Sequence, residues 1–250
     1  MAAPSEAPVT RQVSGHAAPA PVPSGPPSWQ PLAAAVAELP VLDASGRPVL
    51  FGELFRERRA IVVFVRHFLC YICKEYVEDL AKIPKSFLQE ANVTLIVIGQ
   101  SSYHHIEAFC KLTGYSHEIY VDPEREIYKR LGMKRGEEIA SSGQSPHVKS
   151  NILSGSIRSL WRAVTGPLFD FQGDPAQQGG TLILGPVEKA MAPHSSTLAW
   201  KIPRMEEPGN NIHFIHHDRN RLDHKPINSV LQLVGVQHVD FTSRPSVIHV

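Results

Sequence analysis

The stretch AIVVFVRHFLCYIC, residues 60–73, decides the fold of this chain. Its first six residues are all apolar, which is typical of a short strand that is buried on both faces. Two cysteines, Cys70 and Cys73, follow after a turn, and the apolar residues beyond them recur at helical spacing. The stretch therefore predicts a buried strand, a turn and a helix whose N-terminus carries both cysteines.

A helix N-terminus changes the chemistry of a cysteine that lies there. Its free N–H groups and the positive end of its dipole stabilise a thiolate, so we expect the pKa of Cys70 to be lowered. Cys73 lies one turn further along, within reach to form a disulfide with Cys70. Zinc sites also use the CxxC spacing, but no second CxxC or Cys/His pair with zinc spacing follows. The context favours redox chemistry over a structural or metal role.

Strand and helix patterns alternate after the cysteines. Apolar runs at residues 93–98 and 118–121 predict two more strands, and helical periodicity predicts helices that end at Gly114 and Gly132. Pro84 should break the helix that carries the cysteines. Such an alternation is typical of an α/β protein with a parallel sheet and helices on both faces.

Further elements are predicted on both sides of this alternating region. Residues 40–50 indicate two short strands around a Ser-Gly turn, and residues 152–164 have the periodicity of a helix. Two more strands are predicted at residues 181–184 and 211–217. We expect Asp223 to cap a final helix.

The chain divides into an N-terminal segment, one domain and a tail. Residues 1–30 are rich in Ala, Pro, Ser and Gly, so we expect them to be disordered, because they cannot bury enough surface to offset their ordering entropy. The domain is expected over residues 31–236 and an extended tail over 237–250. Residues 187–208 separate two strands whose turn residues would connect well without them, and they look like a translated repeat element. We expect them to form an inserted loop.

Composition narrows the classes of function. The chain has 250 residues, 25 Lys and Arg against 24 Asp and Glu, and a formal net charge of +1, with both signs scattered. No nucleic-acid partner is therefore expected. No apolar run approaches the ~20 residues that span a membrane, so no membrane partner is expected either. Three cysteines without a secretory signal fit a reducing compartment, and we expect a cytoplasmic location.

Several short motifs occur together along this chain. They are Phe64-Val65-Arg66 before the CxxC, Leu131-Gly132-Met133, Gly173-Asp174, Gly179-Gly180-Thr181-Leu182-Ile183-Leu184, and Phe214-Ile215-His216-His217 before the last helix. In this combination the chain resembles the peroxiredoxin-like 2 family of AhpC/TSA-type antioxidant proteins, over roughly residues 40–236 without the insertion. The resemblance implies a thioredoxin-like fold, with a central mixed β-sheet flanked by helices on both faces. It also implies thiol-based antioxidant or redox-regulatory activity.

Two departures from better-known relatives limit what the resemblance implies. Typical peroxiredoxins have Pro-x-x-x-Thr-x-x-Cys around the peroxide-reducing cysteine, but counting back from Cys70 these places hold Val63 and His67. The peroxide-binding pocket therefore cannot be carried over. Thioredoxins have a cis-proline before the strand that faces the CxxC, and the corresponding place here holds Gly180 and Thr181.

Each candidate site residue has a functional and a structural interpretation. Cys70 is the expected nucleophile, since it is nearest the helix N-terminus and is expected to be the more exposed thiol, and Cys73 is the expected buried resolving thiol. The alternatives are an idle motif and a small core residue. Arg66 and His67 could supply positive charge near the thiolate, or could be a strand end turned to solvent. Gly179-Gly180 predicts either a close backbone approach to the CxxC or a bulge.

Four other residues invite a functional interpretation that we do not favour. Cys110 lies between apolar neighbours on a predicted helix, which favours core packing. His213, His216 and His217 suggest a metal site, but in a strand the first and last share one face while His216 points to the other. A solvated strand face is the favoured interpretation, and neither a metal nor another cofactor is expected.

Two functions remain open on the sequence. The first is a thiol oxidoreductase or antioxidant protein, in which the Cys70 thiolate attacks a small-molecule peroxide or a protein disulfide and Cys73 then closes the disulfide. An external thiol reductant of the thioredoxin or glutathione type would restore the dithiol. The second is a thioredoxin-fold regulatory module that binds a signalling partner, with little or no turnover. The missing peroxide-activating groups favour the second function, and the two intact cysteines favour the first.

Overall fold

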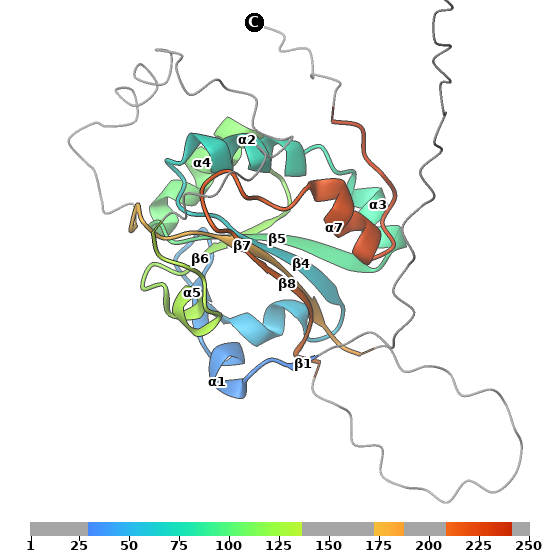
Figure 1. Ribbon diagram of the computed structural model, residues 1–250, viewed down its shortest axis with the longest axis horizontal. Coiled ribbons are helices and arrows are strands. Elements are labelled where there is room, and N and C mark those ends of the chain that lie inside the picture. The colour runs from blue at the N-terminus through green and yellow to red at the C-terminus, as the bar shows by residue number, and fades with distance from the viewer. Residues whose placement is uncertain (1–29, 137–172, 188–208, 242–250) are drawn as a thin grey trace, which may run out of the picture.

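The computed structural model describes residues 30–136, 173–187 and 209–241 of the chain (Figure 1). Its strands are β1 (Gln30–Pro31), β2 (Pro40–Leu42), β3 (Pro48–Leu50), β4 (Arg59–Phe64), β5 (Val93–Gly99), β6 (Glu118–Val121), β7 (Gly180–Gly185) and β8 (Asn211–His217). Its α-helices are α1 (Ala34–Ala37), α2 (Tyr71–Leu80), α3 (Lys85–Glu90), α4 (Ile106–Thr113), α5 (Glu126–Arg130) and α7 (Ile227–Leu233). Two short 3-10 turns are η1 (Phe51–Phe55) and η2 (Tyr103–His105).

All the described strands belong to a single mixed sheet. Their order is β1-β8-β7-β4-β5-β6-β2-β3, with β4, β5 and β6 parallel and β7 and β8 antiparallel to their neighbours. The predicted parallel sheet is thus confined to the centre, and the mixed sheet implied by the family resemblance is confirmed. The β4-α2-β5 crossover followed by the β7-β8 hairpin and α7 gives the chain a thioredoxin-like fold.

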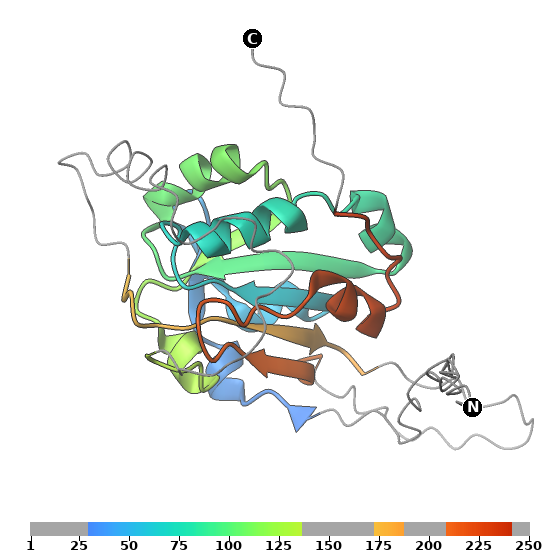
Figure 2. The same ribbon diagram turned by 45° about the horizontal axis from the view of Figure 1, so that its top comes forward.

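The sheet separates two apolar cores, because successive side chains of a strand point to opposite faces. Ile61 and Val63 of β4 pack against α2, α4 and α7, whereas Val62 and Phe64 pack against η1, α1 and α5. Figures 1 and 2 show α2, α3, α4 and α7 on one face of the sheet and α1 and α5 on the other. Helices on both faces are therefore confirmed, and β4, from which the CxxC loop leaves, is buried in the middle.

Proline and glycine end the helices as the sequence predicts. The helix with the cysteines ends at Leu80, and Pro84 then stands at the N-cap of α3. Gly114 follows α4 in a left-handed conformation, with φ at 70°, which a residue without Cβ adopts at little cost. None of the described helices has the length and apolar character needed to cross a membrane.

Helix starts were predicted less well than helix ends. Asp223 does not cap α7, whose N-cap is Pro226, because the Asp223 carboxylate instead accepts hydrogen bonds from the backbone and the guanidinium of Arg219. The helix expected before Gly132 begins at Glu126, four residues after Asp122. The Asp122 carboxylate nevertheless accepts the Glu126 backbone N–H at 3.2 Å, so it caps that helix across a turn.

Several expectations fall on residues outside the described part of the chain. These are the N-terminal segment up to residue 29, the helix over residues 152–164, the inserted loop from residue 188 and the tail beyond residue 241. The described start of the tail, residues 237–241, has neither helix nor strand but is attached to the domain. Asn228 of α7 accepts the Val239 backbone N–H at 3.0 Å and donates to the Val239 carbonyl at 2.9 Å.

Two glycines allow the end of β4 and the hairpin to approach closely. A Cβ on Gly179 would collide with the backbone carbonyl oxygen of Phe64, and one on Gly180 would collide with that of His216. The close approach that we expected toward the CxxC is thus not made to the cysteines: Gly179 lies against the backbone at the end of β4, and Gly180 against the backbone of β8. The irregularity between β7 and β8 lies at Ile183, so Gly179-Gly180 is not a bulge.

We predict that Gly179→Ala lowers the free energy of unfolding by about 3 kcal/mol, because backbone atoms of β4 cannot move aside for the added methyl group. The matched control is Gly114→Ala, where a Cβ would meet nothing within 4 Å. Only its left-handed backbone opposes that substitution, at roughly 1–2 kcal/mol. Urea unfolding of both variants checks this expectation, and equal losses would show that the contact with Phe64 is not the constraint.

Candidate active site around the CxxC cysteines

Cys70 stands at the N-cap of α2, directly after the loop that leaves β4. Its Sγ accepts a hydrogen bond from the backbone N–H of Cys73 at 3.4 Å, and its carbonyl accepts the N–H of Lys74 at 2.9 Å. The predicted strand, turn and helix are thus present, and the sulfur occupies the position that a Ser or Asp oxygen takes in other helices. A negative charge on this sulfur is stabilised by the helix N-terminus.

Both thiols are buried, which corrects one expectation from the sequence. Cys73 is fully buried as predicted, but Cys70 is only 6% exposed and not the open thiol that we expected. The reason is that the loop before it folds into the core, where the ring of Phe68 stacks on Phe109 at 4.3 Å. Both cysteines are free thiols in this structure.

Arg66 provides positive charge beside Cys70, as the sequence predicted. Its Nη1 lies 4.0 Å from Cys70 Sγ, at the limit of a hydrogen bond to sulfur. The guanidinium is held by backbone carbonyls of one loop, because Nε donates to Gln177 at 3.2 Å and Nη2 donates to Pro175. Arg66 is itself buried, so its charge acts on the sulfur with little screening by solvent.

His67 does not supply the positive charge that we expected of it. The pKa of His67 is lowered to about 4, first by burial and then by the charges of Arg66 and Arg221. The imidazole is therefore neutral at neutral pH. The charge near the thiol comes from Arg66, while His67 contributes only a half-buried ring.

The environment separates the two thiols into an acidic and a non-acidic one. The pKa of Cys70 is lowered to about 6, first by a hydrogen bond from the Cys73 thiol, against burial, and further by the Cys73 N–H, Arg66 and His224. Burial raises the pKa of Cys73, and the neighbouring Cys70 raises it further. At neutral pH the pair is a Cys70 thiolate beside a protonated Cys73, which is the arrangement of a nucleophile and a resolving thiol.

Gly180 and Thr181 lie on β7 opposite the end of β4, paired with Phe64 and Val63 respectively. Thr181 shares the face of Val63, toward α2, and its side chain forms a hydrogen bond with Tyr76. No peptide bond among the described residues is cis. The place that holds a cis-proline in thioredoxins is thus occupied by Gly180 and Thr181 with ordinary trans peptide bonds, as the sequence indicated.

A buried His–Asp pair at the site was missed by the sequence reasoning. His224 Nδ1 lies 2.7 Å from Asp218 Oδ2, and both residues are buried between β8 and α7. The His224 ring also lies against the ring of Tyr76, with centroids 4.7 Å apart. The sequence does contain a carboxylate and a histidine in the loop after β8, which leaves the sheet at the same end as the CxxC loop. Their spacing of six residues belongs to no known motif, so the sequence did not point to a pair.

The remaining histidines and Cys110 do not join the site. His213 lies 3.2 Å from the Gly185 carbonyl oxygen, His216 lies 2.8 Å from that of Asp223, and His217 lies 2.8 Å from that of Leu131. These half-buried rings point to three different places, so the strand face is less solvated than expected. Within the described residues no group of three potential metal ligands is found. The half-buried Cys110 packs against the core on the side of α2, as predicted.

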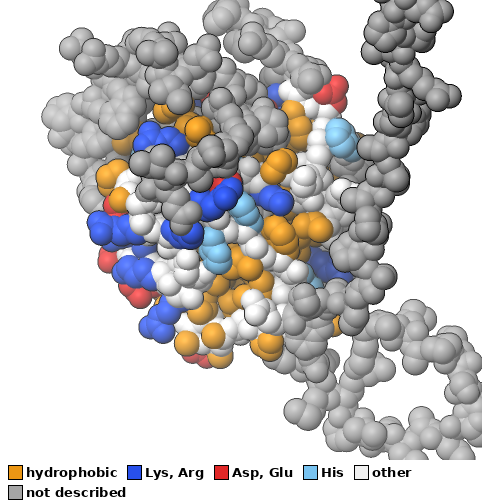
Figure 3. Space-filling model, in the orientation of Figure 1, with side chains coloured by type: hydrophobic (Ala, Val, Ile, Leu, Met, Phe, Trp, Pro, Cys, Tyr) orange, Lys and Arg blue, Asp and Glu red, His pale blue; other side chains and the backbone are white. Residues whose placement is uncertain are grey.

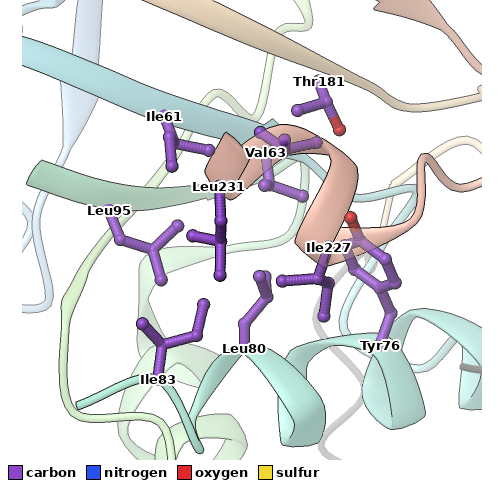
Figure 4. Close-up of a pocket in the computed structure, with 10 residues that line it drawn as sticks. Ile61, Val63, Tyr76, Leu80, Ile83, Leu95, Thr181, Ile227 and Leu231 are labelled. Carbon is purple, nitrogen blue, oxygen red and sulfur yellow. The ribbon is translucent and has the colours of Figure 1, made fainter. Parts of the chain in front are cut away.

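A small apolar cavity lies beneath α7, next to Tyr76 (Figure 4). Its volume is about 10 Å³, which is about the space of one water molecule. The labelled lining is aliphatic except for the hydroxyl-bearing side chains of Tyr76 and Thr181. This space is a packing gap between the helices and the sheet, too small to hold a substrate.

We predict that the reduced protein contains one thiolate near pH 7 and that this thiolate is Cys70. Because the pKa of Cys70 is lowered to about 6, absorbance of the thiolate near 240 nm should fall as the pH drops through that value. The step should disappear in Cys70→Ser. It should persist in Cys110→Ser, because burial raises the pKa of the Cys110 thiol, which therefore does not contribute to the step. A step that survives in Cys70→Ser would contradict the assignment.

Comparison with known proteins shows the family to which the chain belongs. A family described as AhpC/TSA antioxidant enzyme matches residues 79–196, a match that begins within α2 after both cysteines. The chain is 90% identical to peroxiredoxin-like 2C of Bos taurus over 250 residues, with 100% of this chain and 100% of the relative covered. The corresponding human protein is 82% identical over 250 residues, with the same coverage.

Solved structures resemble the chain more distantly. Peroxiredoxin Q of Xanthomonas campestris is 12% identical, with a TM-score of 0.41 and with 61% of this chain and 77% of that chain covered. The near identity to the two mammalian relatives along the whole sequence decides the assignment. The chain belongs to the peroxiredoxin-like 2 family.

Proposed function

We propose that the chain is a thiol-dependent redox protein in which Cys70 and Cys73 cycle between dithiol and disulfide. The observation that carries the proposal is the position of Cys70 Sγ, which accepts the Cys73 N–H at the start of α2 and lies 4.0 Å from the Arg66 guanidinium. A thiolate stabilised in this way is a nucleophile at neutral pH. Membership of a family of thioredoxin-fold redox proteins supports the same class of chemistry.

The reaction with a peroxide follows from the two thiols. The Cys70 thiolate attacks the terminal oxygen of a hydroperoxide, an S–O bond forms, the O–O bond breaks, and the alkoxide takes up a proton and leaves as an alcohol. The Cys73 thiol then attacks the sulfenic acid, so that a disulfide forms and water leaves. Sulfur is oxidised by two electrons, and the peroxide is reduced by two.

A disulfide substrate would react at the same sulfur. The Cys70 thiolate would form a mixed disulfide and release one substrate thiol, and Cys73 would lose its proton, close the internal disulfide and release the second thiol. An external thiol reductant of the thioredoxin or glutathione type would supply two electrons and two protons to restore the dithiol. We expect this cycle in the reducing environment of the cytoplasm.

A regulatory module remains the second candidate, and two observations favour it. Cys70 is only 6% exposed, and the places of the peroxide-activating proline and threonine hold Val63 and the neutral His67. In this function the disulfide would act as a redox sensor that alters the binding of a partner, with little or no turnover. The two candidates share the Cys70–Cys73 disulfide and differ in whether the rate of its formation and reduction supports turnover.

We predict that mild oxidation converts Cys70 and Cys73 into a reversible intramolecular disulfide. The Cys73 backbone nitrogen is already 3.4 Å from Cys70 Sγ, and the two residues are one helical turn apart, so little backbone movement is needed. Mass spectrometry of peptides should show the loss of two hydrogens across this pair. Cys110→Ser should leave the bond intact, whereas a bridge that includes Cys110, or recovery of both thiols unchanged, would refute the proposal.

We also predict that peroxide reduction is slow compared with that of typical peroxiredoxins. Val63 and His67 cannot orient a peroxide as proline and threonine do, and orientation supplies a large part of such rates. Stopped-flow oxidation of the reduced protein, with Cys70→Ser as the blank, measures the second-order rate. A value that approaches the diffusion ceiling of about 10⁸ M⁻¹s⁻¹ would show that activating groups exist which this interpretation lacks.

A further inference from the structure

The His224–Asp218 pair is built into the loop that joins β8 to α7. The backbone N–H of Asp218 donates to the Gly179 carbonyl at 3.1 Å, which fixes the carboxylate at the end of the sheet where the CxxC loop begins. His224 Nδ1 donates to Asp218 Oδ2 at 2.7 Å, because a carboxylate can only accept. The side chains are 3% and 1% exposed, so this charged contact is almost free of solvent.

Packing on α2 places this pair beside the thiols. Cys70, Cys73 and Tyr76 follow each other at intervals of three residues, so they share one face at the start of the helix. The Tyr76 ring lies 4.7 Å from the His224 ring, and its hydroxyl donates to the Lys225 carbonyl at 2.6 Å. The imidazole is thus held over the same helix face that carries both sulfurs.

One atom of the imidazole is left without a partner. His224 Nε2 is buried and has no hydrogen-bond partner among the described residues, whereas Nδ1 is fully engaged by Asp218. Buried polar atoms are nearly always hydrogen-bonded, so an unpaired nitrogen in a ring that packs on the helix of the two thiols calls for an explanation. Since Nδ1 carries its proton toward Asp218, Nε2 is the atom that can accept another.

We propose that His224, positioned by Asp218, is a second cationic partner of Cys70 in addition to Arg66, and that it holds at Nε2 the proton that the Cys70 thiol releases. In the resting protein the S–H bond breaks and an N–H bond forms, which gives a thiolate and an imidazolium. After the thiolate has attacked a hydroperoxide or a disulfide, the departing alkoxide or thiolate takes the proton from Nε2 and leaves as alcohol or thiol. This inference rests on the proposed thiol chemistry and adds the source of its proton.

The charges around the imidazole agree with this role. Burial alone lowers the pKa of His224, but the charge and hydrogen bond of Asp218 and the charge of Cys70 raise it above its ordinary value. Arg66 acts in the opposite direction. On β8, His216 Nε2 lies 3.4 Å from the other carboxylate oxygen of Asp218, Oδ1. On α2, burial raises the pKa of Tyr76 above its ordinary value, so that its hydroxyl stays uncharged.

The surface near the pair carries further positive charge. Figure 3 shows Lys and Arg side chains with His side chains among them on the middle of the face seen in Figure 1. On the loop after β8, Arg219 binds Asp223, and Arg221 acts on His67. His224, by contrast, is buried, and its charge acts on Cys70 itself.

The test is the pH dependence of Cys70 alkylation in the reduced, full-length protein. Iodoacetamide labelling of Cys70, followed by peptide mass spectrometry from pH 5 to 9, reads the thiolate directly. We expect His224→Gln to raise the apparent pKa of Cys70 by about one unit. Labelling should then be about fivefold slower near pH 6, about tenfold slower near pH 5 and unchanged near pH 9. Asp218→Asn should act in the same direction.

His213→Gln is the matched control, since His213 lies on β8 away from the thiols and contacts the Gly185 carbonyl. Its profile should match that of the unaltered protein. A His224→Gln profile that overlaps the wild type, or one that is slowed equally at every pH, would overturn the inference, since the second result indicates a merely structural role. Thermal melting shows whether each variant is folded.

A second measurement covers the case in which both loop variants unfold. NMR titration of the His224 imidazole in wild type and in Cys70→Ser should show a lower pKa for His224 once the thiolate is removed, and an unchanged value would overturn the inference. Neither measurement requires turnover. If the protein forms no disulfide but His224→Gln still raises the pKa of Cys70, the proposed function alone is refuted. If the disulfide forms but the pKa of Cys70 does not change in His224→Gln, only the role of His224 is refuted.

Discussion

The hydrogen bond from the Cys73 N–H to Cys70 Sγ is the interaction on which the rest of the site depends. It makes the sulfur the N-cap of α2, so that one contact both starts the helix and stabilises a thiolate. The bond forms only because β4, buried on both faces, delivers the chain to this point in the middle of the sheet. Thiol acidity and helix position are therefore consequences of the same local geometry.

The antiparallel contact between β4 and β7 brings the remaining groups to that helix end. Gly179 allows the start of the hairpin to lie against the Phe64 carbonyl, Gly180 allows β8 to lie close to β7, and Asp218 is then fixed by the Gly179 carbonyl. As a result, Arg66 next to Cys70 and the His224–Asp218 pair next to Tyr76 are gathered at a helix whose thiols solvent barely reaches. Charge acts strongly there because water does not screen it.

Burial is also what separates the two functional interpretations. Because Cys70 is only 6% exposed, a substrate of ordinary size cannot reach its sulfur freely in this conformation. Such a site suits slow or selective chemistry better than the rapid removal of small peroxides. In the proposed redox couple of Cys70 and Cys73, the fold sets the acidity of the thiols and the same packing restricts access to them.

The sequence by itself determined the strands with strong apolar runs, the break at Pro84, the position of Cys70 and Cys73 at a helix start and the charge of Arg66, because each depends on neighbours within one turn or one strand. Helix starts were harder to predict from the sequence, since the Asp223 carboxylate binds Arg219 and does not cap α7. Only the tertiary structure decided the neutral state of His67, the burial of Cys70 and the pairing of His224 with Asp218. These depend on solvent exclusion and on contacts between β8, α7 and α2, which are far apart in the chain, and no local pattern encodes them.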